Sequence, residues 1–360
     1  MESTARRHDI DWIRVIAIGL LLIYHTTIGF QPWGVFIGFI KSNESLESLW
    51  IPMSMLNIWR IPLLFVVSGM GVAFAIKRRN FKSLLKERTL RILIPFVFGT
   101  LVIVPLHAFL WQDYYSQDLQ HPMHPYHLWF LGNIFIYVLV LSPLFFFLKS
   151  DRSTKFREGL NKLFSNPLGV LLMIIPFILE AEILRPESFE TYAINMHGFW
   201  LGLVAFLVGF LFVSSGQNVW ETLKKWAWVF IAVAFGLYLI RVVYFEYRVP
   251  FYLMAIESNL WIFAVFGLGY KFLNKPSDRL TYWSQAAYPV YILHMIFIYL
   301  ISYLIFGLGW NPWIEFTVVT LGTFLGCWLT YEFVVKRVSF LRPLFGLKKK
   351  PNVEVVLSMV

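Results

Sequence analysis

Ten apolar segments of about twenty residues dominate this sequence. A helical run of that length can cross the hydrocarbon core of a bilayer. Hydrophobic residues make up 58% of the chain and charged residues 14%, against about 45–50% and about 25% in soluble domains. The sequence therefore predicts an all-α, polytopic membrane bundle of about ten transmembrane helices. We place the spans at 12–31, 53–76, 92–111, 127–148, 167–184, 197–214, 226–244, 257–273, 284–306 and 313–335.

The basic residues predict an orientation. Of the 31 Lys and Arg residues, 26 fall near the two termini or in alternate connectors, which would all share one side of the membrane. Such residues concentrate on the cytosolic side, so we expect both termini in the cytosol and a multi-pass protein of the inner (plasma) membrane. The net charge of +10 then reflects anchoring to the bilayer and not nucleic-acid binding. We expect one membrane domain over 1–345, a basic flexible tail over 346–360 and no cleavable signal peptide; the oligomeric state stays open.

Arg14 and His25 lie in the first apolar segment with ten residues between them. Eleven helical steps return to nearly the same face, about 20° off, and rise roughly 16 Å. An ionisable residue inside a span is costly and by default marks a site or a pathway. A neutral imidazole can take a proton from a hydroxyl, and an arginine can hold phosphate or carboxylate. Alternatively, Asp11 and Arg14 form an interfacial ion pair and His25 is a hydrogen-bonded core residue.

Three further arginines lie within or directly before a predicted span. Arg60 either snorkels to the outer headgroups or contacts an anion or acceptor. Arg88 and Arg91 end a basic amphipathic connector, 77–91, before the third span. They either anchor that span on the cytosolic side or bind the phosphates of a nucleotide-bearing donor. In the second span, Ser68-Gly69 favours a close helix contact over a nucleophile, because small residues let helices approach.

Histidines and carboxylates complete the candidates. His127 opens a span after His121 and His124, but Pro122 and Pro125 break the helix that would align the three for a metal. His294 and Glu332 lie within or at the end of the last two spans. Two other groups would line an outward cavity or, as we favour, form interfacial ion pairs: Glu180, Glu182 and Arg185; and Arg241, Glu246 and Arg248. The single Cys327 excludes a disulfide within the chain.

Six motifs, taken together and in order, resemble the integral membrane acyltransferase 3 family over about residues 9–345. Within that family the chain looks most like the glucan biosynthesis protein C branch, which succinylates periplasmic glucans. The motifs are Arg14-x10-His25, Phe65-Val-Val-Ser-Gly69, Arg88 and Arg91 before Pro95, His127-Leu-Trp-Phe-Leu131, Tyr288-Pro-Val-Tyr-Ile-Leu-His294, and Tyr331-Glu332.

The resemblance implies a ten-helix O-acyltransferase that takes an acyl group from cytosolic acyl-CoA. The acceptor would be a hydroxyl of a carbohydrate or glucan at the outer face. The family's signature pair matches Arg14 and His25, and Asp11 fits the acidic position before the arginine. We expect His25 to act as general base on the acceptor hydroxyl, and acyl-CoA to be a donor substrate with no bound cofactor or metal. Donor and substrate contacts are expected from Arg60, Arg88, Arg91, His127, His294 and Glu332.

One departure from the branch keeps the substrate open. The branch places a second histidine after the one that matches His294, and here Met295 follows. The acyl group is then acetyl or succinyl, and the acceptor a glucan or another carbohydrate. The rival hypothesis is a non-catalytic transporter of acyl groups or lipid-linked sugars, in which the polar residues of the first span form a pathway.

Overall fold

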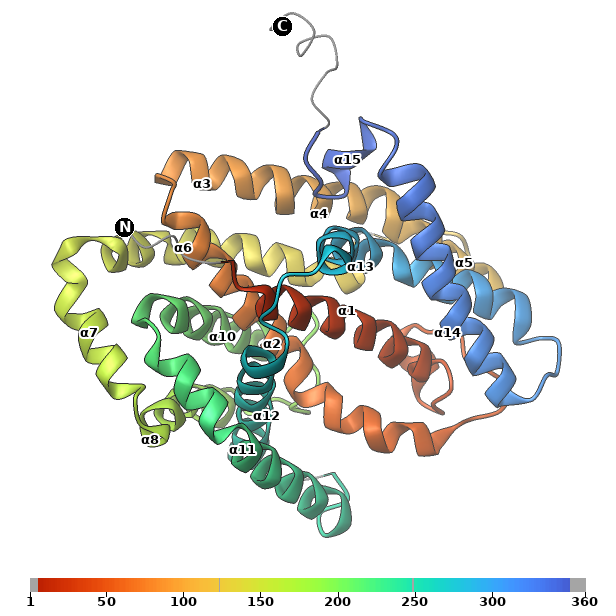
Figure 1. Cartoon of the computed structure of the whole chain (residues 1–360). Coiled ribbons are helices and arrows are strands. Elements are labelled where there is room, and N and C mark those ends of the chain that lie inside the picture. The colour runs from red at the N-terminus through yellow and green to blue at the C-terminus, as the bar shows by residue number, and fades with distance from the viewer. Residues whose placement is uncertain (1–5, 123, 248, 350–360) are drawn as a thin grey trace, which may run out of the picture. The chain divides into compact units, whose positions relative to one another are not determined.

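A computed structural model describes residues 6–122, 124–247 and 249–349, and these residues form helices and no β-strand. Ten helical segments of this described part are long and apolar enough to cross a membrane, which confirms the predicted all-α, ten-span class. The α-helices labelled in Figure 1, or lying between those labels, are α1 (His8–Ile28), α2 (Trp50–Ile76), α3 (Phe81–Arg88), α4 (Ile94–Phe98), α5 (Val104–Tyr114), α6 (Trp129–Lys149), α7 (Thr154–Leu163), α8 (Pro167–Leu171), α9 (Ile175–Leu184), α10 (Met196–Ser215), α11 (Asn218–Val243), α12 (Phe251–Phe272), α13 (Asp278–Ile305), α14 (Pro312–Leu329) and α15 (Leu341–Leu344).

The chain divides into two compact units. The first comprises Met1–Leu21, Ser48–Leu85 and Asn133–Ser284. The second comprises Leu22–Glu47, Lys86–Gly132 and Gln285–Val360. The predicted domain over 1–345 and tail over 346–360 stay predictions, and residues 350–360 of that tail lie outside the described residues.

Helix pairs build the first unit. The α11 and α12 helices run side by side, and α2 packs along α10 (Figure 1). Glycines let α2 and α10 approach at backbone distance: a Cβ added at Gly69 would collide with the carbonyl oxygen of Phe206, and one at Gly209 with that of Val66. The predicted close helix contact at Ser68-Gly69 is confirmed. The Ser68 hydroxyl donates to Leu64 O within α2, 2.7 Å away.

Substituting Gly69 by Ala should destabilise the protein by about 1–3 kcal/mol, since overpacking against backbone forces helices apart. The matched control is Gly236→Ala in α11, where an added Cβ meets no atom within 4 Å. There the higher helix propensity of Ala should leave stability unchanged or raised. Thermal unfolding in detergent measures both variants. Equal midpoints for the two variants would contradict the backbone contact.

The third span is longer than predicted. It runs over Phe81–Tyr114, because the basic connector 77–91 is helical from Phe81 and its first turn is capped by Asn80, whose side-chain oxygen accepts from Ser83 N at 2.9 Å. Two five-residue π-helical segments interrupt it, Thr89–Leu93 and Gly99–Ile103. A third π segment, Thr330–Val335, ends the last span.

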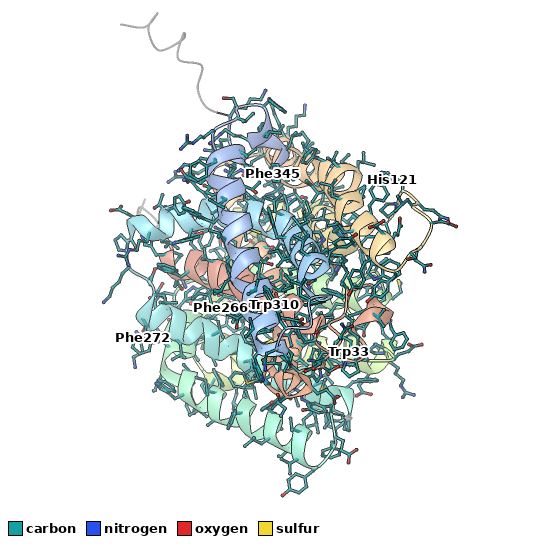
Figure 2. The ribbon with its side chains drawn as sticks, turned by 90° about the vertical axis from the view of Figure 1, so that its right-hand side faces the viewer. Trp33, His121, Phe266, Phe272, Trp310 and Phe345 are labelled. Atoms are coloured by element: carbon teal, nitrogen blue, oxygen red, sulfur yellow. The ribbon has the colours of Figure 1, made fainter. Side chains whose placement is uncertain are left out.

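The end of the second unit folds back on the third span. Phe345, labelled in Figure 2, is 4% exposed and meets the ring of Phe98 edge-on at 5.5 Å. Gly346 follows with φ of 71°, in the left-handed region. A Cβ there would clash with the Tyr288 ring, so glycine is required by both conformation and space.

Candidate active site

The α1 helix carries both residues of the predicted signature pair. Arg14 lies in the part of α1 that belongs to the first unit. Its Nη2 donates to Asp11 Oδ1 at 2.9 Å, and Arg6 binds the other oxygen of Asp11 at 2.8 Å. The predicted Asp11–Arg14 ion pair is therefore present, and the Arg14 side chain is 39% exposed. His25 lies in the part of α1 that belongs to the second unit.

Within the second unit, His25 pairs with His294 of α13. Nδ1 of His25 lies 2.8 Å from Nε2 of His294. The two rings are nearly parallel, at 7°, with centroids 5.1 Å apart. His294 is fully buried, whereas His25 is partly exposed. Sequence reasoning identified both histidines but not that they touch, because 268 residues separate them in the chain.

Hydrogen bonding fixes the tautomers of this pair. Nδ1 of His294 lies 2.6 Å from the carbonyl oxygen of Tyr291. A carbonyl oxygen only accepts, so this nitrogen carries the proton, and in the neutral imidazole Nε2 holds the lone pair. That lone pair accepts the Nδ1 proton of His25. The unprotonated nitrogen of a neutral His25 is therefore Nε2, which is the form that a general base needs.

His127 is the next histidine in this cluster. Its ring centroid lies 5.1 Å from that of His294. Its Nε2 lies 3.2 Å from Ile292 O and donates to it, so in the neutral ring Nδ1 holds the lone pair. The hydroxyl of Tyr291 donates to the carbonyl oxygen of His127. As predicted, His127 opens a span, in a 3₁₀ turn over Tyr126–Leu128 just before α6.

His107 of α5 completes the cluster and was missed by the sequence analysis. It is fully buried, 5.6 Å from the ring of His127 between centroids. The available signal was a histidine inside an apolar segment. Six side-chain rings form a cycle in which each ring contacts the next and the last contacts the first, with centroid distances from 5.1 to 5.8 Å. In order they are His25, His294, His127, His107, Tyr299 and Phe39.

The other arginines predicted to bind donor or substrate do not belong to this cluster of rings. Arg60 of α2 is 1% exposed, so of its two predicted alternatives, snorkelling to the headgroups is wrong, and the anion or acceptor contact stays a prediction. Arg88 and Arg91 both pair with Glu87, at 3.5 and 3.2 Å, and Arg91 remains 46% exposed.

Glu332, in the π segment that ends the last span, pairs with Lys336 one turn later. The Lys336 Nζ lies 2.9 Å from both carboxylate oxygens. The described part of the structure holds no group of three His, Cys, Asp or Glu residues arranged for a metal ion.

Two buried pairs, both within the first unit, replace the interfacial ion pairs predicted for Glu180 and Arg241. Arg241 is fully buried, and its Nε and Nη2 bind the two oxygens of Glu257 at 2.9 and 3.1 Å. Glu180 binds His197 Nδ1 at 2.9 Å. The prediction failed because sequence spacing could not show that Glu257 and His197, on neighbouring helices, supply the partners. Arg248 lies outside the described residues.

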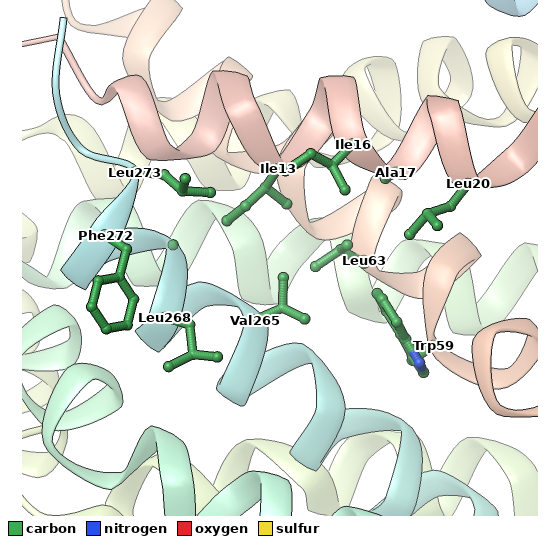
Figure 3. Close-up of a pocket in the computed structure, with 11 residues that line it drawn as sticks. Ile13, Ile16, Ala17, Leu20, Trp59, Leu63, Val265, Leu268, Phe272 and Leu273 are labelled. Atoms are coloured by element: carbon green, nitrogen blue, oxygen red, sulfur yellow. The ribbon is translucent and has the colours of Figure 1, made fainter. Parts of the chain in front are cut away.

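An apolar groove lies in the first unit (Figure 3). One of its lining residues, Ile13, directly precedes Arg14 in the sequence. Its volume is about 310 Å³. Because its lining is almost entirely hydrocarbon, the groove suits an apolar group and not the phosphates of a donor. Residues from α1, α2 and α12 line it, together with Leu273: Ile13, Ile16, Ala17, Leu20, Trp59, Leu63, Val265, Leu268, Gly269 and Phe272.

Comparison with known proteins shows that the chain matches one family model. The model of the acyltransferase 3 family, described as an acyltransferase domain, matches residues 7–332. Two similar curated proteins are the glucans biosynthesis protein C of Salmonella schwarzengrund and that of Salmonella typhimurium. Each is 23% identical over 320 residues, which cover 80% of this chain and 81% of the relative. No solved structure matches significantly.

Proposed function

This chain belongs to the acyltransferase 3 family and is a membrane acyltransferase; from that premise we propose that it moves an acyl group from cytosolic acyl-CoA to a hydroxyl of a carbohydrate at the outer face. The observation that carries the proposal is the His25–His294 pair, whose hydrogen bonds leave Nε2 of His25 unprotonated. The name of the relatives, glucans biosynthesis protein C, supports a glucan as acceptor. The inner membrane stays the proposed location, on the distribution of the basic residues.

In the proposed reaction His25 acts as general base. Its Nε2 takes the proton of the acceptor hydroxyl as the oxygen attacks the thioester carbonyl. The tetrahedral intermediate collapses, the C–S bond breaks, and the proton passes to the departing CoA sulfur. His294 is a positioning residue, because its lone pair holds the Nδ1 proton of His25 and stabilises the imidazolium that forms.

The donor end is assigned to the cytosolic side. Under the predicted orientation, Arg14, Arg88 and Arg91 all lie near the cytosolic ends of their spans, while His25 lies near the outer end of α1. Guanidinium groups bind phosphates through paired hydrogen bonds. Arg91 of the second unit is 46% exposed and Arg14 of the first unit 39%, so each side chain by itself reaches solvent, where a phosphate can bind.

Replacing Arg14 by Ala should raise the KM for acyl-CoA by about tenfold or more, since a charged hydrogen bond is worth about 1.5–3 kcal/mol. The acceptor KM should not change. Lys155→Ala, on an exposed position of α7, removes one positive charge as a control. An unchanged donor KM in Arg14→Ala would instead assign Arg14 to a structural pair with Asp11.

The proposal is tested by the release of free CoA from acetyl-CoA and from succinyl-CoA by purified protein in liposomes, with a soluble glucan supplied. Acceptor-dependent release is expected, and the preferred donor identifies the acyl group. If folded wild-type protein releases no CoA from either donor, the transporter hypothesis replaces this one.

A further inference from the structure

We propose that His107 and His127 form a binding site for a second, non-reacting hydroxyl of a neutral carbohydrate acceptor. This inference rests on the proposed function, because it names how the same site would orient its acceptor. The two imidazoles belong to the second unit, as does His25. The His127 ring lies no more than about 10 Å from that of His25, because each contacts His294 at 5.1 Å.

The first argument is unmet hydrogen-bonding capacity. Within the described residues, no group meets the geometry of a good hydrogen bond to either ring nitrogen of His107 or to Nδ1 of His127; the carbonyl oxygen of Ile103, one turn earlier, is the polar atom near the His107 ring. All three atoms are buried, and the whole His107 side chain is 0% exposed. Buried polar groups in proteins are almost always hydrogen-bonded, so three such atoms on two touching rings indicate a polar ligand.

The second argument concerns which ligand fits. Nδ1 of His127 holds a lone pair, since Nε2 donates to Ile292 O. A neutral His107 has one N–H and one lone pair. The pair therefore offers a donor and two acceptors, which complements a hydroxyl that both donates and accepts. A site for an anion would need hydrogen-bond donors and positive charge. The lone pairs on these two neutral imidazoles would instead repel an anion.

The third argument is the surroundings of the two imidazoles. The rings that contact His107 include Tyr126 at 5.4 Å and Tyr299 at 5.1 Å, and Tyr291 contacts His127 at 5.7 Å. Aromatic faces pack against apolar surface while their hydroxyls bond elsewhere. This combination suits a sugar ring, which presents C–H faces and hydroxyl edges.

The test uses methyl β-glucoside and its monodeoxy analogues as probes. Binding to full-length protein is measured by calorimetry without donor, so that it does not depend on turnover. We expect His107→Phe and His127→Phe to weaken binding of the glucoside at least about tenfold. One deoxy analogue, which lacks the hydroxyl that the two histidines bind, should bind to wild type as weakly as the glucoside binds to these variants. The affinity of that analogue for the variants should be no lower than its affinity for wild type. The control is His121→Phe, an exposed histidine on the loop after α5 (Figure 2).

The outcomes separate this inference from the proposed function. If wild type releases CoA but both Phe variants bind the glucoside as wild type does, ordered water alone satisfies the imidazoles and the inference is overturned. The same follows if the variants weaken all analogues equally and keep the wild-type discrimination. If wild type releases no CoA, the proposed function fails, whatever the binding shows. His107→Asn and His127→Asn repeat the test should a Phe variant unfold.

Discussion

Replacing His25 by Ala is expected to lower the rate of acyl transfer by about 10²–10⁴-fold, the usual contribution of a general base. The loss should appear in kcat with the KM for acyl-CoA unchanged, because the imidazole acts on the acceptor hydroxyl. Acceptor-dependent CoA release by protein in liposomes measures it, with His121→Ala as the control. Full turnover in well-folded His25→Ala protein would exclude the general-base role.

The partner histidine sharpens this test. If His294 acts only through the Nδ1 proton of His25, a distance of 2.8 Å, then His294→Ala should lose less activity than His25→Ala. The double variant should lose scarcely more than His25→Ala alone, since groups that act as a unit are non-additive. Losses that multiply would show that His294 has an independent role.

Replacing Glu257 by Ala is expected to destabilise the protein by about 3–5 kcal/mol, because it leaves the buried guanidinium of Arg241 without its bidentate partner. Arg241 and Glu257 are 0% and 1% exposed. The remaining contacts of Arg241, the carbonyl of Ser54 at 3.2 Å and Glu190 at 3.8 Å, cannot replace two short charged hydrogen bonds. Thermal unfolding in detergent measures the effect.

Two variants serve as controls for that loss. Glu187→Ala removes an exposed carboxylate from the same unit and should change stability by less than about 0.5 kcal/mol. The double variant Arg241→Met, Glu257→Leu should recover most of the stability, because a packed apolar pair can replace a buried ion pair. A mild effect of Glu257→Ala alone would indicate that Arg241 reaches water.

The spans could be predicted from the sequence because hydropathy over twenty residues depends on local composition alone. All ten were found, and the largest error, at the third span, has a local cause: a basic helix continues into the membrane segment as far back as Phe81. Close helix approach at Gly69 was also predictable, since a small residue inside a span has few other uses.

The partners of buried polar residues could not be predicted, because they depend on which helices pack together. His25 was singled out by its cost inside a span and Arg241 as a member of an interfacial ion pair, yet their partners, His294 and Glu257, come from other helices. His107 was missed because it has no neighbouring motif. Its significance comes only from contact with His127, which is twenty residues further along the chain.

The two π-helical segments before His107 have a consequence for insertions and deletions. A π turn bonds each residue to the fifth along instead of the fourth, so each segment holds about one residue more than an α-helix would. Deleting one residue from Gly99–Ile103 would let the regular α-helical ladder close and would leave the direction of His107 nearly unchanged. Deleting one residue from the α-helical stretch after it, residues 104–106, would turn His107 by about 100° and rotate it away from Tyr299. The π segments are thus the places where the third span can lose a residue and keep His107 in the ring cluster, whereas the same loss one turn later would break the cluster with every one of its side chains intact.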